Sequence, residues 1–166
     1  MTRLPAVILI LALGGLSACG FRPLYGDVAG AVGDERLAAV DIGLIADRSG
    51  QVVRNRLLTR MQPAGEIAPS THQLDVDLSE SSIGLAVERD ETATRTNITV
   101  TAQIALTDLA SGELVLLQSV SSYASYDTLT AEYATLSAER DARERALRDL
   151  ADRIATTVAL YLQRTG

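Results

Sequence analysis

The chain has 166 residues with 21 acidic and 15 basic side chains, and its net charge of −6 at pH 7 argues against nucleic acid as a partner. Every basic residue is arginine, and there is one histidine and one cysteine, which excludes a metal site built from those two residue types. The hydrophobic fraction of 47% is ordinary for a chain that forms one globular domain.

The first element, residues 1–18, has the layout of a secretion signal. Arg3 precedes an uncharged run from Leu4 to Leu16. A helix of that length would rise roughly 20 Å, which is short of the ~30 Å hydrocarbon core of a bilayer. The string Leu16-Ser17-Ala18-Cys19 resembles a lipobox, whose small residues before the cysteine suit the signal peptidase. The alternative is an ordinary signal peptide or a short membrane helix with a chance cysteine.

The lipobox predicts cleavage before Cys19 and attachment of lipid to its thiol and to the new amine. Two or more acyl chains anchor a protein stably at a membrane surface, whereas one chain binds only marginally. The next residue is Gly20 and not aspartate, which in lipoprotein sorting favours the outer membrane. Residues 19–34 are rich in glycine and lack a lasting period, so we expect a lipidated tether. Apart from this covalent lipid, we expect no cofactor.

The remaining residues, 35–166, are expected to form a single domain. Residues 36–46 alternate Val40, Ile42 and Leu44 on one face, which predicts a strand. From Gln51 the apolar spacing becomes helical, and Pro63 and Gly65 end that helix.

Three further strands and a long helix follow. The first strand runs from Leu74 to Val87, and its apolar parity slips midway, which predicts a bulge near Ser81-Ser82. The next strands cover 98–107 and 114–123, with a turn at 108–112. Residues 130–164 have helical spacing, with an apolar stripe of Leu147, Leu150, Ile154, Val158 and Tyr161.

The outer face of this helix carries four acid-then-base pairs four residues apart, which is the favourable orientation. These pairs are Glu139–Arg143, Asp141–Arg145, Glu144–Arg148 and Asp149–Arg153. The predicted order β-α-β-β-β-α therefore gives an α+β fold: a two-layer sandwich of two helices packed on one four-stranded, mostly antiparallel sheet.

Residues that could carry chemistry are few. His72 begins a strand with the parity of its apolar positions, so a partly buried structural histidine is favoured over a catalytic one. Asp75 and Asp77 point to one face of a strand, where a solvated face explains them better than a carboxylate pair. We therefore expect that the protein is not an enzyme.

Two groups of arginines are candidates for binding phosphate groups, because the forked guanidinium suits them. Arg54 and Arg56 lie in the first helix, between Arg48 and Arg60, where Asp47 is the only acid nearby in the sequence. Arg89 and Arg95 flank a hairpin tip. The alternative for both groups is a solubilising helix face and a charged loop.

The string Cys19-Gly-Phe-Arg-Pro-Leu-Tyr-Gly26 resembles the mature start of the lipopolysaccharide-assembly lipoprotein family LptE, in its alphaproteobacterial form. Residues 133–147 are similar to the C-terminal helix of that family. The resemblance implies a fold of two helices on a four-stranded sheet and a role that is not catalytic.

Members of the family sit as plugs inside the outer-membrane β-barrel protein LptD, help it fold, and bind lipopolysaccharide. The resemblance thus implies LptD, lipopolysaccharide and outer-membrane lipid as partners, with the domain facing the periplasm and the barrel lumen. It also makes Arg54, Arg56, Arg89 and Arg95 candidate lipopolysaccharide contacts. A lipoprotein adaptor of another envelope complex stays open as the alternative.

Overall fold

The structure is a computed structural model that describes residues 35–62, 69–85, 94–128 and 131–165. The expected signal peptide, the tether with Cys19, and Arg89 lie outside the described residues. Everything below concerns the domain formed by the described ranges.

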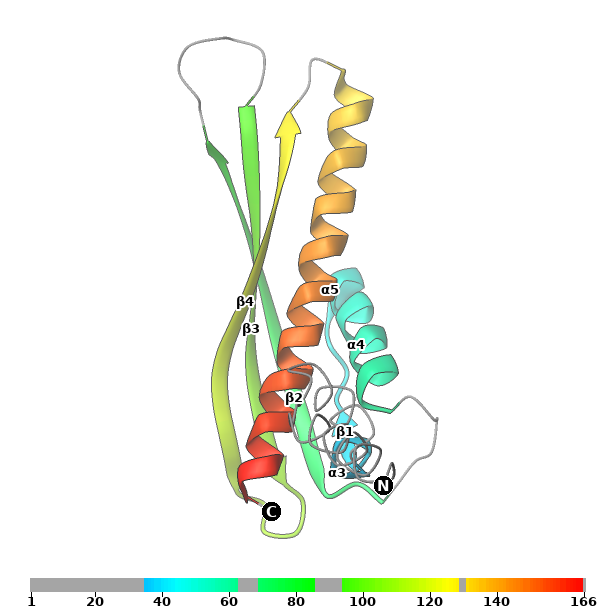
Figure 1. The fold of residues 1–166 in the computed structure, drawn as a ribbon, viewed down its shortest axis with the longest axis vertical. Helices are drawn as coiled ribbons and strands as arrows, with labels where there is room; N and C mark the ends of the chain where they lie inside the picture. The colour runs from blue at the N-terminus through cyan, green and yellow to red at the C-terminus, as the bar shows by residue number, and fades with distance from the viewer. Residues whose placement is uncertain (1–34, 63–68, 86–93, 129–130, 166) are drawn as a thin grey trace, which may run out of the picture. The chain divides into compact units, whose positions relative to one another are not determined.

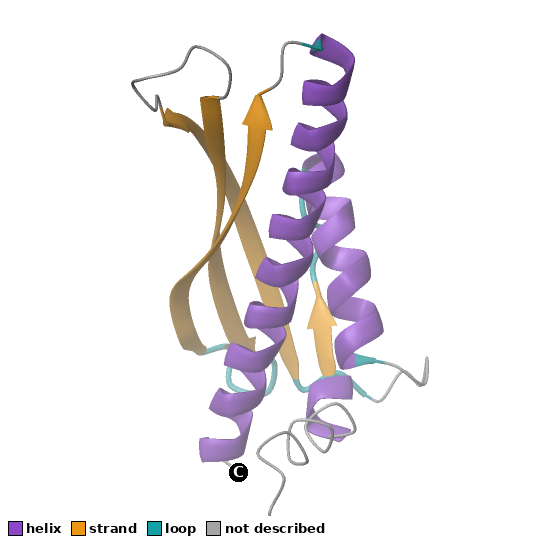
Figure 2. Ribbon diagram, turned by 45° about the horizontal axis from the view of Figure 1, so that its top comes forward, coloured by secondary structure: helices purple, strands orange, loops and turns teal. Residues whose placement is uncertain are grey.

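The domain has the α+β architecture that the sequence predicts. Its strands are β1 (Val40–Ile42), β2 (His72–Leu85), β3 (Thr94–Asp108) and β4 (Leu114–Thr128), in that order across one sheet. The long helices α4 (Asp47–Met61) and α5 (Glu132–Thr165) cover one face of the sheet, and no helix of the described residues covers the other, which we call the open face (Figures 1 and 2). β1 pairs with β2 in parallel, and the other neighbours are antiparallel.

The core lies between the helices and the sheet. The even-numbered residues of β3 from Ile98 to Leu106 are all buried, as the alternation of apolar and polar residues predicts. The expected stripe of α5 is also confirmed, with Tyr161 at its partly buried margin. Small residues complete the buried surface of α5 and keep it smooth: Ala142, Ala146, Ala151, Ala155 and Ala159.

The prediction of one strand over residues 36–46 was wrong. A short helix, α3 (Glu35–Ala38), occupies its beginning, and the strand is reduced to β1. Val40 and Ile42 are buried as expected, but Leu44 is 93% exposed. The chain leaves the sheet at Gly43, whose N–H donates to the Leu74 carbonyl at 3.0 Å. Beyond Gly43 the alternation of apolar residues therefore does not correspond to a buried face of the sheet.

The first long helix begins at Asp47, four residues before its expected start at Gln51. The residue before it, Ala46, makes no side-chain capping bond. Helix starts are recognised in sequences by a Ser, Thr, Asp or Asn cap, so this start carried no signal in the cap position.

The expected bulge near Ser81-Ser82 was also wrong. The register between β2 and β3 is unbroken from His72 opposite Asp108 to Leu85 opposite Arg95. Ile83 therefore points to the open face, where it is 62% exposed. Because every residue from Ser79 to Gly84 is exposed, burial imposes no parity on this end of the strand. The irregularity lies instead between β3 and β4, after Leu106.

Candidate functional site

Arg54, a candidate phosphate contact, is bound to the backbone at the end of β1. Its Nε lies 3.3 Å from the Ile42 carbonyl oxygen and 3.2 Å from that of Gly43, and its Nη2 lies 3.2 Å from Ile42. The side chain thereby satisfies carbonyls where the chain leaves the sheet, so it holds β1 against α4.

Arg56 forms a forked ion pair with Asp152 of α5. Its Nε and Nη2 each lie 3.0 Å from one carboxylate oxygen of Asp152, and Arg60 approaches the same group at 3.8 Å. Hydrogen bonding to Asp152, followed by Coulomb attraction, raises the pKa of Arg56 above its ordinary value. The first helix is thus not locally free of acids, because the fold brings in a carboxylate 96 residues away.

Of the hairpin pair, only Arg95 lies within the described residues. It faces Asp127 across β3 and β4 at 3.3 Å, and the two side chains are 60% and 58% exposed. An exposed pair of this kind contributes little to stability, so the guanidinium can exchange its partner at small cost.

His72 is partly buried, as expected. Its Nδ1 lies 2.9 Å from the Thr71 hydroxyl oxygen, and its Nε2 lies 3.9 Å from Asp108. The backbone N–H groups of Ser111 and Ala110 lower the pKa of Asp108, with a smaller contribution from His72. This arrangement fastens the β3–β4 turn. Asp75 and Asp77 are both exposed, and the described part of the chain has no cluster of three or more metal-ligating side chains.

The outer face of α5 carries the four predicted ion pairs. Their shortest distances are 2.7 Å for Glu139–Arg143, 3.2 Å for Asp141–Arg145, 3.9 Å for Glu144–Arg148 and 2.7 Å for Asp149–Arg153. Two of these pairs also reach the sheet, which periodicity did not reveal. Arg143 lies 2.8 Å from Glu80 of β2, and the buried Ser122 hydroxyl donates to Asp149 at 2.7 Å.

The open face of the sheet is lined with uncharged hydroxyl and amide groups along its middle. Two adjacent rows cross the three long strands there, one formed by Ser81, Thr99 and Tyr123 and the other by Ser79, Thr101 and Ser121. The sequence predicted a solvated face for individual strands, but the rows depend on the register between the strands.

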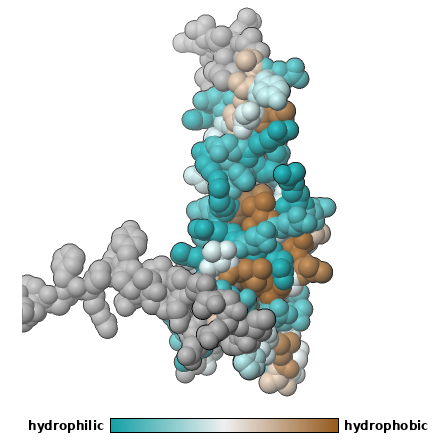
Figure 3. Space-filling view, turned by 90° about the vertical axis from the view of Figure 1, so that its right-hand side faces the viewer, coloured by the Kyte–Doolittle hydropathy of each residue, from teal (hydrophilic) through white to brown (hydrophobic). Residues whose placement is uncertain are grey.

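The opposite side of the domain, where the helices lie, is shown in Figure 3. Its described surface is mostly hydrophilic with separate hydrophobic patches.

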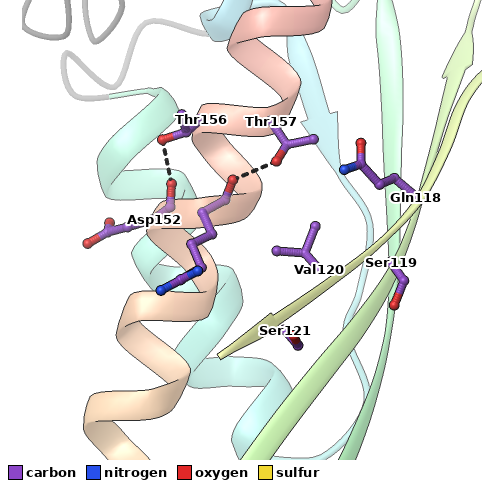
Figure 4. Close-up of a pocket in the computed structure, with 8 residues that line it drawn as sticks. Gln118, Ser119, Val120, Ser121, Asp152, Thr156 and Thr157 are labelled. Atoms are coloured by element: carbon purple, nitrogen blue, oxygen red, sulfur yellow. Dashed lines mark hydrogen bonds between the residues drawn. The ribbon is translucent and has the colours of Figure 1, made fainter. Parts of the chain in front are cut away.

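A groove of about 500 Å³ runs between the edge of the sheet and α5. β4 contributes Gln118 to Ser121, and α5 contributes Asp152, Arg153, Thr156 and Thr157 (Figure 4). No sequence motif marked this groove, because its walls are about thirty residues apart in the chain and meet only in the fold. None of the described helices is long and apolar enough to cross a membrane.

Comparison with known proteins decides the family. The model of the family described as LptE, lipopolysaccharide-assembly, matches residues 37–158, which include β1, α4 and all three long strands. The chain belongs to the LptE family. The family that the sequence resembles is thereby confirmed, and the match includes the part of the last helix on which the resemblance was noted. No curated protein sequence matches the chain.

Solved structures with a similar fold include a protein of Caulobacter crescentus described as a proposed lipoprotein. It is 21% identical with a TM-score of 0.59, over 82% of this chain and 98% of the other. A minor lipoprotein of Acinetobacter baumannii is 14% identical, covers 73% and 91%, and has a TM-score of 0.48. Rare lipoprotein B of Shewanella oneidensis is 15% identical, covers 75% and 96%, and has a TM-score of 0.47. The first of these likenesses supports the fold of this LptE-family domain.

Proposed function

We propose that this chain is an outer-membrane lipoprotein that plugs the LptD β-barrel and assists its assembly, in the transport of lipopolysaccharide to the cell surface. The observation that carries the proposal is the match to the LptE family over residues 37–158. Cys19 would bear the covalent lipid, and the domain would face the periplasm and the barrel lumen. The proposed role is binding and folding assistance, and it includes no reaction.

Two structural features support a role as a plug. The core is shared by the sheet and both long helices, so the described domain is a preformed body that can dock as a unit. The interior of an outer-membrane barrel is polar, and the surface of the domain has matching chemistry. It presents hydroxyl rows on the sheet and ion-paired charges on α5.

Depletion of the protein tests this function. If the chain is the plug, correctly assembled LptD and surface lipopolysaccharide both decline, and a tagged copy at native level recovers LptD from membranes. Undiminished LptD in depleted cells, together with no recovery of LptD, would overturn the proposal. Those same results would favour an adaptor of another envelope complex.

Direct contact with lipopolysaccharide through Arg54, Arg56, Arg89 and Arg95 is a separate proposal within this function. Arg95 is supported best, because the carboxylate of Asp127 with which it pairs is exposed to solvent. Arg54 and Arg56 already hold β1 and α5, so a charge reversal there would also weaken folding.

The test compares the double variants Arg89→Glu/Arg95→Glu and Arg54→Glu/Arg56→Glu for lipopolysaccharide binding at low and high salt. Each variant is also measured for its thermal unfolding midpoint. A charge-driven contact weakens with the swap and with salt. Normal binding by both folded variants at every salt concentration would exclude the arginine contacts.

A further inference from the structure

Within the described part of the chain, the outer edge of β4 is a long strand edge without a neighbouring strand. β4 is the last strand in the sheet order, and within the described ranges it is paired only with β3. From Leu116 to Thr128 its register with β3 is regular, so no bulge interrupts the edge along which another strand could continue the ladder. A free edge of this kind presents a row of backbone N–H and C=O groups to any extended chain.

The edge of β4 also lacks the usual features that prevent strand pairing. Folded proteins protect free edges with charged residues, proline, bulges or short strands. Between Leu114 and Tyr126 there is neither a charged residue nor a proline, and the one irregularity lies at the beginning of the strand. The other free edge gives the contrast, since β2 beyond its pairing with β1 carries Asp75, Asp77 and Glu80.

Exposed apolar side chains lie on the same strand. Leu117 is 68% exposed and Tyr123 is 73% exposed, and both point to the open face. Between them on that face lie Ser119 and Ser121, which are also exposed. A strand added to β4 would place its own side chains directly beside this row, where cross-strand pairs with aromatic and aliphatic residues are favourable.

The side of the added strand facing the helices would lie over the groove between β4 and α5 (Figure 4). The two charged groups in its wall are already paired, Asp152 with Arg56 and Arg153 with Asp149. None of the other residues that line the groove has a charged side chain. The groove therefore matches the uncharged polar or small side chains of an extended segment better than a charged peptide.

We propose that β4 is a docking strand, to which an extended segment of the barrel protein adds by backbone hydrogen bonds. The inference rests on the proposed function, which supplies the barrel protein as the partner, and the groove, whose charged groups are paired, and the exposed Leu117 and Tyr123 suit an uncharged extended segment. Main-chain pairing would supply affinity, and the Leu117–Tyr123 row and the groove would select the side chains.

A pair of matched double variants tests the edge. Ser119→Lys/Ser121→Lys places two lysines on β4, and lysine is a natural protector of strand edges. The control, Ser79→Lys/Ser81→Lys, adds the same charges to the same face on β2. All four serines are exposed, and Ser79 lies in the same row as Ser121, across Thr101 of β3. Unchanged unfolding midpoints would show that both variants fold.

In a pull-down of the full-length lipoprotein, we expect the β4 variant to recover about tenfold less barrel protein than wild type, or less still. The β2 variant should recover the same amount as wild type. Equal loss in both variants would indicate contact through the face and would overturn edge pairing. Normal recovery by the β4 variant would overturn it as well. If wild type itself recovers no barrel protein, the proposed function fails first, and the inference falls with it.

Amide hydrogen exchange gives an independent readout. In an edge strand roughly half of the N–H groups point away from the sheet and lack a ladder partner. Those of β4 should become protected in the complex, whereas β3, which is already paired on both sides, should change little. Unchanged exchange in β4, or photo-crosslinks from β4 that join two copies of this chain, would refute the proposed occupant.

Discussion

Gly50 should resist replacement by alanine, although it lies within a helix. It is the fourth residue of α4 and is buried. A Cβ built on it would lie 2.6 Å from the Ile45 carbonyl oxygen, 2.7 Å from the Ile45 carbonyl carbon and 2.8 Å from its Cγ2. The first two atoms belong to the backbone segment that leads into the helix. The start of α4 would therefore have to move to make room for a methyl group.

Two effects of opposite sign determine the size of the change. Alanine in place of glycine within a helix stabilises by about 0.8–1.0 kcal/mol. Forcing an extra methyl group into a packed site typically costs about 1–3 kcal/mol. Because two of the close contacts involve backbone, the cost should lie toward the upper end of that range. We expect Gly50→Ala to lower the free energy of unfolding by about 1–2 kcal/mol, which corresponds to roughly 3–10 °C in the melting midpoint.

Urea and thermal unfolding of the purified protein measure this effect. Gly84→Ala in β2 is the control, because a Cβ there meets nothing within 4 Å. That change should leave stability unaltered or raise it by up to about 1 kcal/mol. A Gly50→Ala variant as stable as wild type, or more stable, would refute the close seating of α4 on Ile45.

Three further predictions have simpler readouts. The intact mass of the mature protein should correspond to a chain that starts at Cys19 and carries added acyl mass; an unmodified start at another residue would exclude the lipobox. Leu150→Ala, at a fully buried position, should cost about 2–5 kcal/mol in urea unfolding, whereas Arg148→Ala on the exposed face should cost under about 1 kcal/mol, and equal costs would contradict the assigned faces. The hydrogen bond from Ser122 and the neighbouring Arg153 lower the pKa of Asp149, so its contribution to stability is present above the ordinary pKa of aspartate and is lost as the pH falls through the lowered value. Ser122→Ala should therefore reduce the acid dependence of the unfolding midpoint, and an unchanged pH profile would argue against this coupling.

Local periodicity was sufficient to predict the elements that face one core along their whole length. β3 alternates because one of its faces is covered by helices, and the middle of α5 repeats its apolar residues because one side of it packs on the sheet. Where no helix covers the sheet, the spacing of apolar residues no longer predicts which of them are buried. The position of Ile83 indicated a bulge and that of Leu44 indicated a longer strand, but both side chains are exposed. Among the candidate phosphate contacts, sequence identified the arginines but not their partners.

Residues close together in the chain were enough to predict the fold class, the order of the long elements, the paired outer face of α5 and the family resemblance. Which side chains are engaged with one another depends instead on contacts between distant parts of the chain. Asp152 meets Arg56 across 96 positions, and Ser122 meets Asp149 across 27. Among the described strands, β4 is the last one in the sheet, and this is why its outer edge is unpaired. Such contacts are set by the packing of whole elements, and no local pattern encodes that packing.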